Sequence, residues 1–166
     1  MTSTTEFPFH IKQSDQQGCI PTNISATLQA LEIPGITECH LFRAYFSTIC
    51  FSNIIHLKVL DAIPFNGQKL SDLLDLDVYI ARSFEDWWSY VTYCLQSHRF
   101  VLFAFKVPGG SHIRTAVHLV SSSNTIETYD PNPNLQSTAI SMSKEELATW
   151  WSSGKLNHDL LWICKR

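Results

Sequence analysis

The chain has 166 residues, of which 45% are hydrophobic and 12% aromatic, and 12 Lys and Arg against 15 Asp and Glu give a formal net charge of −3. This composition lies far from the low hydrophobicity and high charge of disordered chains, and it predicts one globular domain over residues 1–166. The small negative charge argues against nucleic acid as a partner, because phosphates attract basic surfaces.

The sequence shows no signal for export or membrane insertion. Residues 1–9 contain no basic residue and no apolar stretch of signal-peptide length, and the longest fully apolar run is residues 100–105. A membrane-spanning helix needs about 20 apolar residues. The five cysteines are widely spaced without a CxxC pair, which is typical of free thiols in a reducing compartment. We therefore expect no membrane span and a cytoplasmic location by default, with export as an effector by another route left open.

Helices are predicted in the first part of the chain. Apolar residues recur at helical spacing over residues 20–31, which predicts the first helix. Residues 38–49 are predicted as a second helix, although their Phe, Tyr, Thr and Ile content also permits a strand. A third helix is predicted over residues 83–96, because Ser83 and Asp86 have the spacing of a capping box.

Mainly strands are predicted after these helices. A buried strand, a turn, a hairpin, one more capped helix and a closing strand are expected in that order. Their residues are 100–107 for the strand, 108–110 for the turn, 113–120 and 125–129 for the hairpin closed by 121–124, 143–151 for the helix, and 160–164 for the last strand. The expected fold is therefore α+β, with an N-terminal helical part followed by a mainly antiparallel sheet.

Cys19 stands at the entry of the first predicted helix, six residues after Gln13. The unpaired backbone NH groups and the macrodipole at a helix N-terminus favour the thiolate, which is the nucleophilic form of cysteine. Gln13 can supply a side-chain NH to the oxyanion that forms when Cys19 attacks a carbonyl, with the backbone NH of Cys19 as the second donor. A free cysteine alone is more often a buried core residue, so the Gln13 spacing is what favours a catalytic role.

A thiolate nucleophile also needs a base that later protonates the leaving group, and the base needs an orienting partner. Asp130 is the candidate orienting carboxylate. His112 and His118 lie 18 and 12 residues before it and are the candidate bases. The predicted hairpin returns Asp130 toward the strand that carries them, and their spacing of six places both on the same face of a regular strand.

This order of residues resembles that of the papain-like cysteine peptidases, in particular the bacteriocin-processing branch. In that branch a Gln precedes a helix-opening Cys by six residues, a His begins a strand, and an Asp-Pro pair follows a hairpin. Gln13, Cys19, His112 and the pair Asp130-Pro131 match this pattern. Residues 143–154 are similar to the helix that follows the Asp-Pro in the branch, whereas residues 39–82 match nothing in it.

The resemblance favours His112 over His118 as the base, because the family interval from His to Asp is near 18 residues. The chain departs from the family in two places. Ile20 follows the cysteine where the family has Gly, Ala or Trp, so a bulky residue stands beside the oxyanion NH. Arg114 and Thr115 are polar where the family strand is apolar.

The resemblance implies a papain-like fold and a thiol-dependent hydrolase, a cysteine peptidase with a Cys19-His112-Asp130 triad, a thioester intermediate and a peptide or protein substrate. No metal or organic cofactor is expected. A non-proteolytic amidase, deamidase or acyltransferase stays open, and so does an inactive peptide-binding module, which the bulky Ile20 favours. The oligomeric state is undetermined. The remaining cysteines are expected in the core: Cys39, Cys50, Cys94 and Cys164.

Overall fold

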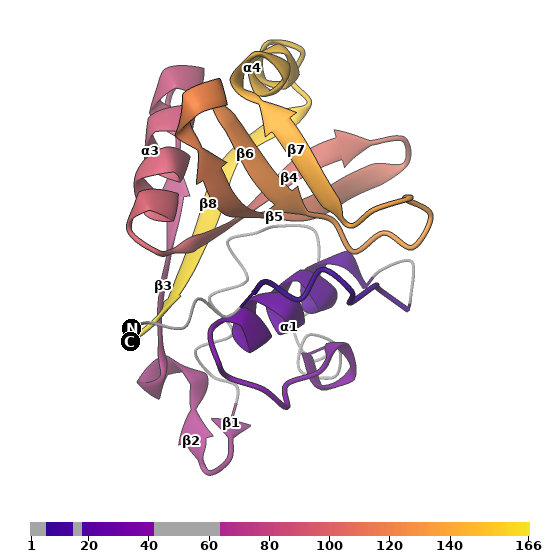
Figure 1. Ribbon diagram of the computed structural model, residues 1–166, viewed down its shortest axis with the longest axis vertical. Coiled ribbons are helices and arrows are strands. Elements are labelled where there is room, and N and C mark those ends of the chain that lie inside the picture. Colours follow the sequence, from indigo (N-terminus) through magenta and orange to yellow (C-terminus); the bar gives the residue numbers. More distant parts are fainter. Residues whose placement is uncertain (1–5, 15–17, 42–63) are drawn as a thin grey trace.

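The computed structural model describes residues 6–14, 18–41 and 64–166. These residues form an α+β fold around a six-stranded sheet with the order β3-β8-β4-β5-β6-β7 (Figure 1). All neighbouring strands in this sheet are antiparallel, which confirms the expected sheet type. The strands are β3 (Leu74–Ile80), β4 (Phe100–Val107), β5 (Gly110–Val120), β6 (Thr125–Tyr129), β7 (Ala139–Ser143) and β8 (Leu156–Lys165), with β1 (Pro64–Phe65) and β2 (Gln68–Lys69) forming a separate two-stranded ribbon.

The helices that pack on the sheet begin where the sequence predicts. They are α1 (Cys19–Ala30), α3 (Phe84–Gln96) and α4 (Lys144–Ser152). Ser83 and Ser143 cap α3 and α4, because each hydroxyl accepts a 3.1 Å hydrogen bond from the backbone NH three residues later. Residues 38–41 are helical, and residues 42–49 of the predicted second helix lie outside the described residues. No helix in the described part of the chain is long and apolar enough to cross a bilayer.

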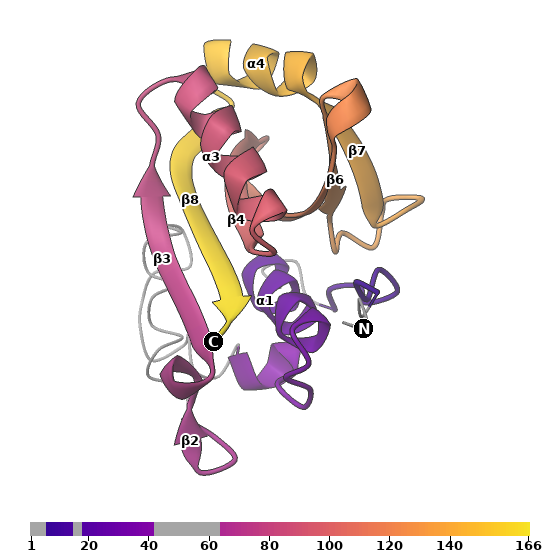
Figure 2. The ribbon, with the colours of Figure 1, turned by 60° about the vertical axis from the view of Figure 1, so that its left-hand side comes forward.

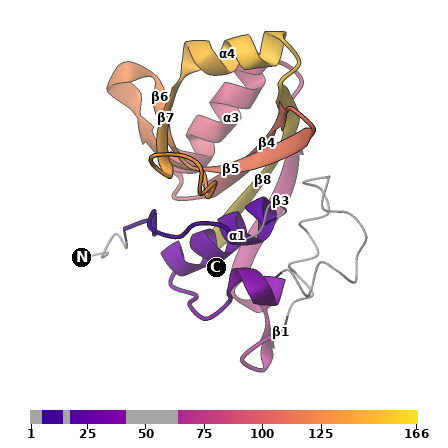
Figure 3. The ribbon, with the colours of Figure 1, turned by 90° about the vertical axis from the view of Figure 1, so that its right-hand side faces the viewer.

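The sheet is covered on both faces (Figure 3). On one face Leu102 and Ala104 of β4 pack against α1, and on the other face Phe103 and Phe105 pack with side chains of α3 and α4. Because successive residues of a strand point to opposite faces, a strand covered on both sides is apolar throughout. This arrangement explains the continuous apolar run of β4.

The expected order of helices before strands is wrong in one respect, because β1, β2 and β3 precede α3. Strand β3 lies along β8 at the edge of the sheet (Figure 2) and pairs with it from Leu74 opposite Lys165 to Ile80 opposite Asp159. Residues 79 to 91 positions apart in the sequence thus become neighbours. The alternating Asp75 and Asp77 of β3 weaken its apolar pattern, and such charges are common on edge strands.

Candidate active site

Cys19 is the first residue of α1 and is half-buried. The N-cap is Gly18, which has no side chain to accept a hydrogen bond from the first backbone NH groups. The first turn of the helix contains no acidic residue. The positive end of the helix dipole at Cys19 is therefore not offset by a carboxylate within that turn. The side chain of the next residue, Ile20, packs into the core between α1 and the sheet and is only 5% exposed.

His112 of β5 lies beside Asp130, which directly follows β6. The imidazole Nε2 is 2.6 Å from Asp130 Oδ1, and the Asp130 side chain is 2% exposed. An ionised carboxylate can only accept hydrogen bonds, so Nε2 carries the hydrogen and donates it to Asp130. The second ring nitrogen, Nδ1, is then the one left to accept a proton. Phe105, opposite His112 on β4, packs against the imidazole with an edge-on ring contact at 5.5 Å.

His118 is exposed and pairs with Glu127 of β6. A β-bulge between Ala116 and His118 interrupts the regular alternation of β5. Ala116 and Leu119 both pack on the face covered by α3 and α4, so His118 points to the opposite face from His112. The expectation that both histidines share a face is therefore wrong, and the structure brings His112 to Asp130.

Cys19, at the start of α1, lies close enough to the imidazole of His112 to act on its pKa. Burial of the ring alone would lower the pKa of His112, but the hydrogen bond with Asp130 and the interactions of the ring with Asp130 and Cys19 outweigh burial. The pKa of His112 is raised as a result from its usual 6.5 to about 9. The imidazole is therefore mostly protonated at neutral pH, which is the form that pairs with a thiolate.

Asp130 has three hydrogen-bond donors around its carboxylate. His112 Nε2 and the backbone NH of Asn132 bond to Oδ1, at 2.6 and 3.0 Å, and Arg114 Nε bonds to Oδ2 at 2.7 Å. Burial alone would raise the pKa of Asp130, but these donors and the charge of His112 hold it below its usual value. The sequence marked Arg114 only as a departure from the family pattern, and its contact with Asp130 could not be read from that pattern.

Asn23 joins the first turn of α1 to β5, and the sequence analysis assigned it no part in the site. Its side-chain amide donates to the carbonyl of Cys19 at 2.7 Å and to the carbonyl of Ile113 at 3.0 Å. Its side-chain oxygen accepts from the hydroxyl of Thr115 at 2.7 Å, and Asn23 and Thr115 are both fully buried. This network fixes the residue after His112 relative to Cys19. Only a search for buried polar residues at helical and strand spacing could have indicated it.

Gln13 lies in the N-terminal segment that crosses the end of β6. Its backbone NH donates to the carbonyl of Pro131 at 2.9 Å, and the hydroxyl of Tyr129 donates to the carbonyl of Ile11 at 2.8 Å. The next residue, Ser14, is bound through its NH and its hydroxyl by the carboxylate of Glu38. The segment is thus fixed beside Asp130 from two sides, and the oxyanion role of the Gln13 side chain stays a prediction.

The other cysteines differ in burial. Cys94 is buried and Cys164 is partly buried, but Cys39 is exposed, so the expectation that Cys39 belongs to the core is wrong. Cys50 lies outside the described residues. Over residues 6–14, 18–41 and 64–166, His, Cys, Asp and Glu form no group of three that could hold a metal ion.

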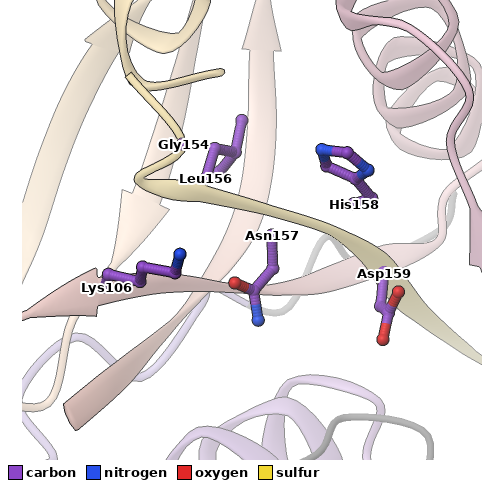
Figure 4. Close-up of a pocket in the computed structure, with 6 residues that line it drawn as sticks. All are labelled: Lys106, Gly154, Leu156, Asn157, His158 and Asp159. Carbon is purple, nitrogen blue, oxygen red and sulfur yellow. The ribbon is translucent and has the colours of Figure 1, made fainter. Parts of the chain in front are cut away.

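A shallow cavity of about 380 Å³ lies on β4 and β8 (Figure 4). In the sheet, β4 lies between β8 and β5, the strand that carries His112. The register between β4 and β8 is irregular here: opposite Phe103 and Phe105 of β4, the partners on β8 move from Leu160 to Leu156. Asn157 and Asp159 lie on one side of β8 and His158 on the other. The lining does not include Cys19, His112 or Asp130, and consists of Lys106, Gly154, Leu156, Asn157, His158 and Asp159.

Comparisons with known proteins find little. No protein-family model matches the chain, and no curated protein sequence matches it. Among solved structures, the chain is similar to the Pseudomonas avirulence protein AvrPphB, with 12% sequence identity and a TM-score of 0.34. The match covers 55% of this chain and 51% of that chain, so it spans about half the length of each. A similarity of this size assigns neither a family nor an activity.

Proposed function

We propose that the protein is a thiol-dependent hydrolase, a cysteine peptidase of papain-like fold that resembles the bacteriocin-processing branch. The single observation that carries this proposal is the position of the His112 imidazole between two partners. It donates to Asp130 at 2.6 Å, and Cys19 at the N-terminus of α1 lies close enough to act on its pKa. Acyl transfer requires a nucleophile, a base beside it and a carboxylate that orients the base, and these three residues are of those types.

In the proposed reaction, the thiol proton of Cys19 resides on His112 Nδ1 before the attack, and the Cys19 sulfur forms a bond to the carbonyl carbon of an amide. The negative charge that develops on the carbonyl oxygen is bound by the backbone NH of Cys19 and the side chain of Gln13. The C–N bond then breaks as the imidazolium gives its proton to the departing amine, leaving a thioester. His112 next removes a proton from water, which attacks the thioester, releases the acid and regenerates the thiol.

The burial of Ile20 also supports an enzyme over an inactive binding module. The binding-module alternative depended on a bulky residue beside the oxyanion NH of Cys19. Because the Ile20 side chain packs into the core between α1 and the sheet, it does not occupy the space in front of the thiol. The departure from the family at this position therefore gives no reason to expect a blocked site.

Reactivity of Cys19 tests the proposal, with the exposed Cys39 of the same chain as an internal control. Cys19 is expected to react with iodoacetamide at pH 7 at least about 10-fold faster than Cys39, because an activated thiolate reacts and a thiol does not. Peptide mass spectrometry measures both rates in one sample. His112→Gln should remove the difference without unfolding the chain, as judged by circular dichroism. Equal rates at Cys19 and Cys39 in the unchanged protein would contradict the proposal.

The reaction products separate peptidase activity from its relatives. Incubation with a mixture of unstructured peptides, followed by mass spectrometry, should give cleaved peptides that are absent with Cys19→Ala. Conversion of a side-chain amide to an acid without cleavage would indicate a deamidase instead. A peptide joined to an added amine would indicate an acyltransferase.

A further inference from the structure

Arg114 contacts the side of Asp130 that His112 leaves free. His112 Nε2 bonds to Oδ1 of the carboxylate, and Arg114 Nε bonds to Oδ2 at 2.7 Å. All three side chains are largely shielded from water, with 15%, 12% and 2% of the side chain exposed for His112, Arg114 and Asp130. The carboxylate is thus held between two cationic groups in a poorly solvated place.

The Arg114 guanidinium is fixed by more than this ion pair. Its central carbon lies 4.9 Å from the ring centre of Phe105 and 5.7 Å from that of Trp150. A second nitrogen, Nη1, lies 3.4 Å from the sulfur of Met142. Arginine stacks on aromatic rings in this way when it is held in one geometry. Arg114 is therefore a rigid partner of Asp130 and not a solvated surface cation.

The four side chains form a row in which the charges alternate when the thiol is ionised: Cys19, His112, Asp130 and Arg114. If His112 loses its proton, Asp130 without Arg114 would be a buried anion with no cation beside it, which is costly. We propose that Arg114 is a positioning residue that keeps Asp130 ionised in both protonation states of His112, and so allows His112 to release its proton. This inference rests on the proposed function in so far as His112 acts as the acid and base.

The direction in which the pKa of His112 changes when Arg114 is replaced distinguishes this role from simple packing. If the Arg114 charge is removed while Asp130 stays in place, protonated His112 becomes the one cation that pairs with the carboxylate. His112 should then hold its proton more tightly, so its pKa should rise. If Arg114 only held the strands together, its replacement would displace Asp130 and the pKa of His112 should fall toward its usual 6.5. The two roles thus predict opposite shifts.

The other charged and titratable groups around His112 are the same in chains with and without Arg114. They are Cys19 on α1 and Asp130 after β6, whereas Phe105 on β4 is uncharged. Lys155, just before β8, lies 4.0 Å from the Trp150 ring centre and 5.7 Å from that of Phe105, the two rings that Arg114 also contacts. Because its cation is not altered by replacing Arg114, any shift reports on Arg114.

The test is an NMR titration of the His112 imidazole in the full chain with Cys19→Ala, which removes the thiol and its effect on the ring. Arg114→Gln keeps an NH donor for Asp130 and removes the charge, and it should raise the pKa of His112 by about 1 unit. Arg114→Lys keeps the charge and should leave the pKa within a few tenths of the parent. Loss of one signal in Cys19→Ala/His112→Gln assigns His112 among the seven histidines. An unchanged or lowered pKa in Arg114→Gln would overturn the proposal.

A second measurement needs no substitution at Arg114 and decides the case even if Arg114→Gln fails to fold. The ¹³C carboxyl signal of Asp130 in the unchanged chain should show an ionised group on both sides of the His112 titration. A carboxyl group that takes up a proton when His112 loses one would overturn the role of Arg114. Both NMR results are independent of Cys19 reactivity. Failure of the iodoacetamide test would therefore contradict the proposed function, and the NMR results on Arg114 and Asp130 could still be interpreted.

Discussion

At the scale of single residues, Asn23 is the polar side chain that ties the proposed nucleophile to the strand of the proposed base. It uses both amide hydrogens and its oxygen on protein partners, the carbonyls of Cys19 and Ile113 and the hydroxyl of Thr115. A buried amide that is fully paired stabilises one relative position of its partners, since any other position leaves a donor or acceptor unpaired. The first turn of α1 is thereby fixed against β5.

Replacing Asn23 with Asp keeps the shape and removes the two donors, so that a carboxylate oxygen faces two carbonyl oxygens. We expect Asn23→Asp to lower the free energy of unfolding by about 3 kcal/mol at pH 7. Thr115→Val, which removes one hydroxyl of the same network, should cost about 1 kcal/mol. Urea denaturation followed by tryptophan fluorescence measures both changes.

The exposed Asn134 provides the matched control, because Asn134→Asp makes the same chemical change where water can solvate it. Its effect on stability is expected to stay within about 0.5 kcal/mol. Similar losses for the buried and exposed substitutions would show that the network does not contribute as described.

At the scale of helices and strands, prediction from sequence succeeds where the signal is local. The cap residue Ser83 and the apolar spacing after it predict 83–96, and the structure has α3 at Phe84–Gln96. The apolar run predicts β4 at its observed bounds. Strands β3 and β7 are not predicted, because β3 alternates aspartates at a sheet edge and β7 is short and rich in small or polar residues. Their pairing depends on β8 and β6, which local patterns do not reveal.

The N-cap of α3 gives a prediction of its own. Ser83 Oγ accepts from the backbone NH of Asp86 at 3.1 Å, so Ser83→Ala leaves that NH without its side-chain partner. We expect a loss of about 1 kcal/mol in the free energy of unfolding. Ser89→Ala, on the exposed side of the middle of α3, is the control and should be neutral or slightly stabilising because alanine has the higher helix propensity. Equal effects of the two substitutions would contradict the capping role.

At the scale of the whole molecule, the candidate site is assembled from three segments that are distant in sequence. The order and spacing of Gln13, Cys19, His112 and Asp130 are sufficient to propose that these four residues form one site. They do not predict that the bulge in β5 turns His118 to the other face, or that Arg114 reaches the second oxygen of Asp130. Those features depend on the register between β5 and β6 and on the covering helices, so they require the fold.

The pairing of His112 with Asp130 also couples stability to pH. The pKa of His112 is raised from 6.5 to about 9, so its protonated form stabilises the fold fully below pH 6.5, and this contribution is lost as the pH rises through about 9. The lowered pKa of Asp130 acts in the other direction, and its contribution is lost only as the pH falls below the usual range of the carboxyl group. Stability should therefore decline on the alkaline side of neutrality because of His112.

We expect the free energy of unfolding to fall by up to about 3 kcal/mol between pH 6.5 and pH 9.5. The His112→Gln chain lacks the titrating imidazole and should lose much less over the same range. The difference between the two curves isolates His112 from the cysteines and tyrosines, which titrate in both chains. Urea denaturation at intervals of half a pH unit measures both curves, and parallel curves would show that His112 does not hold its proton more tightly in the folded state.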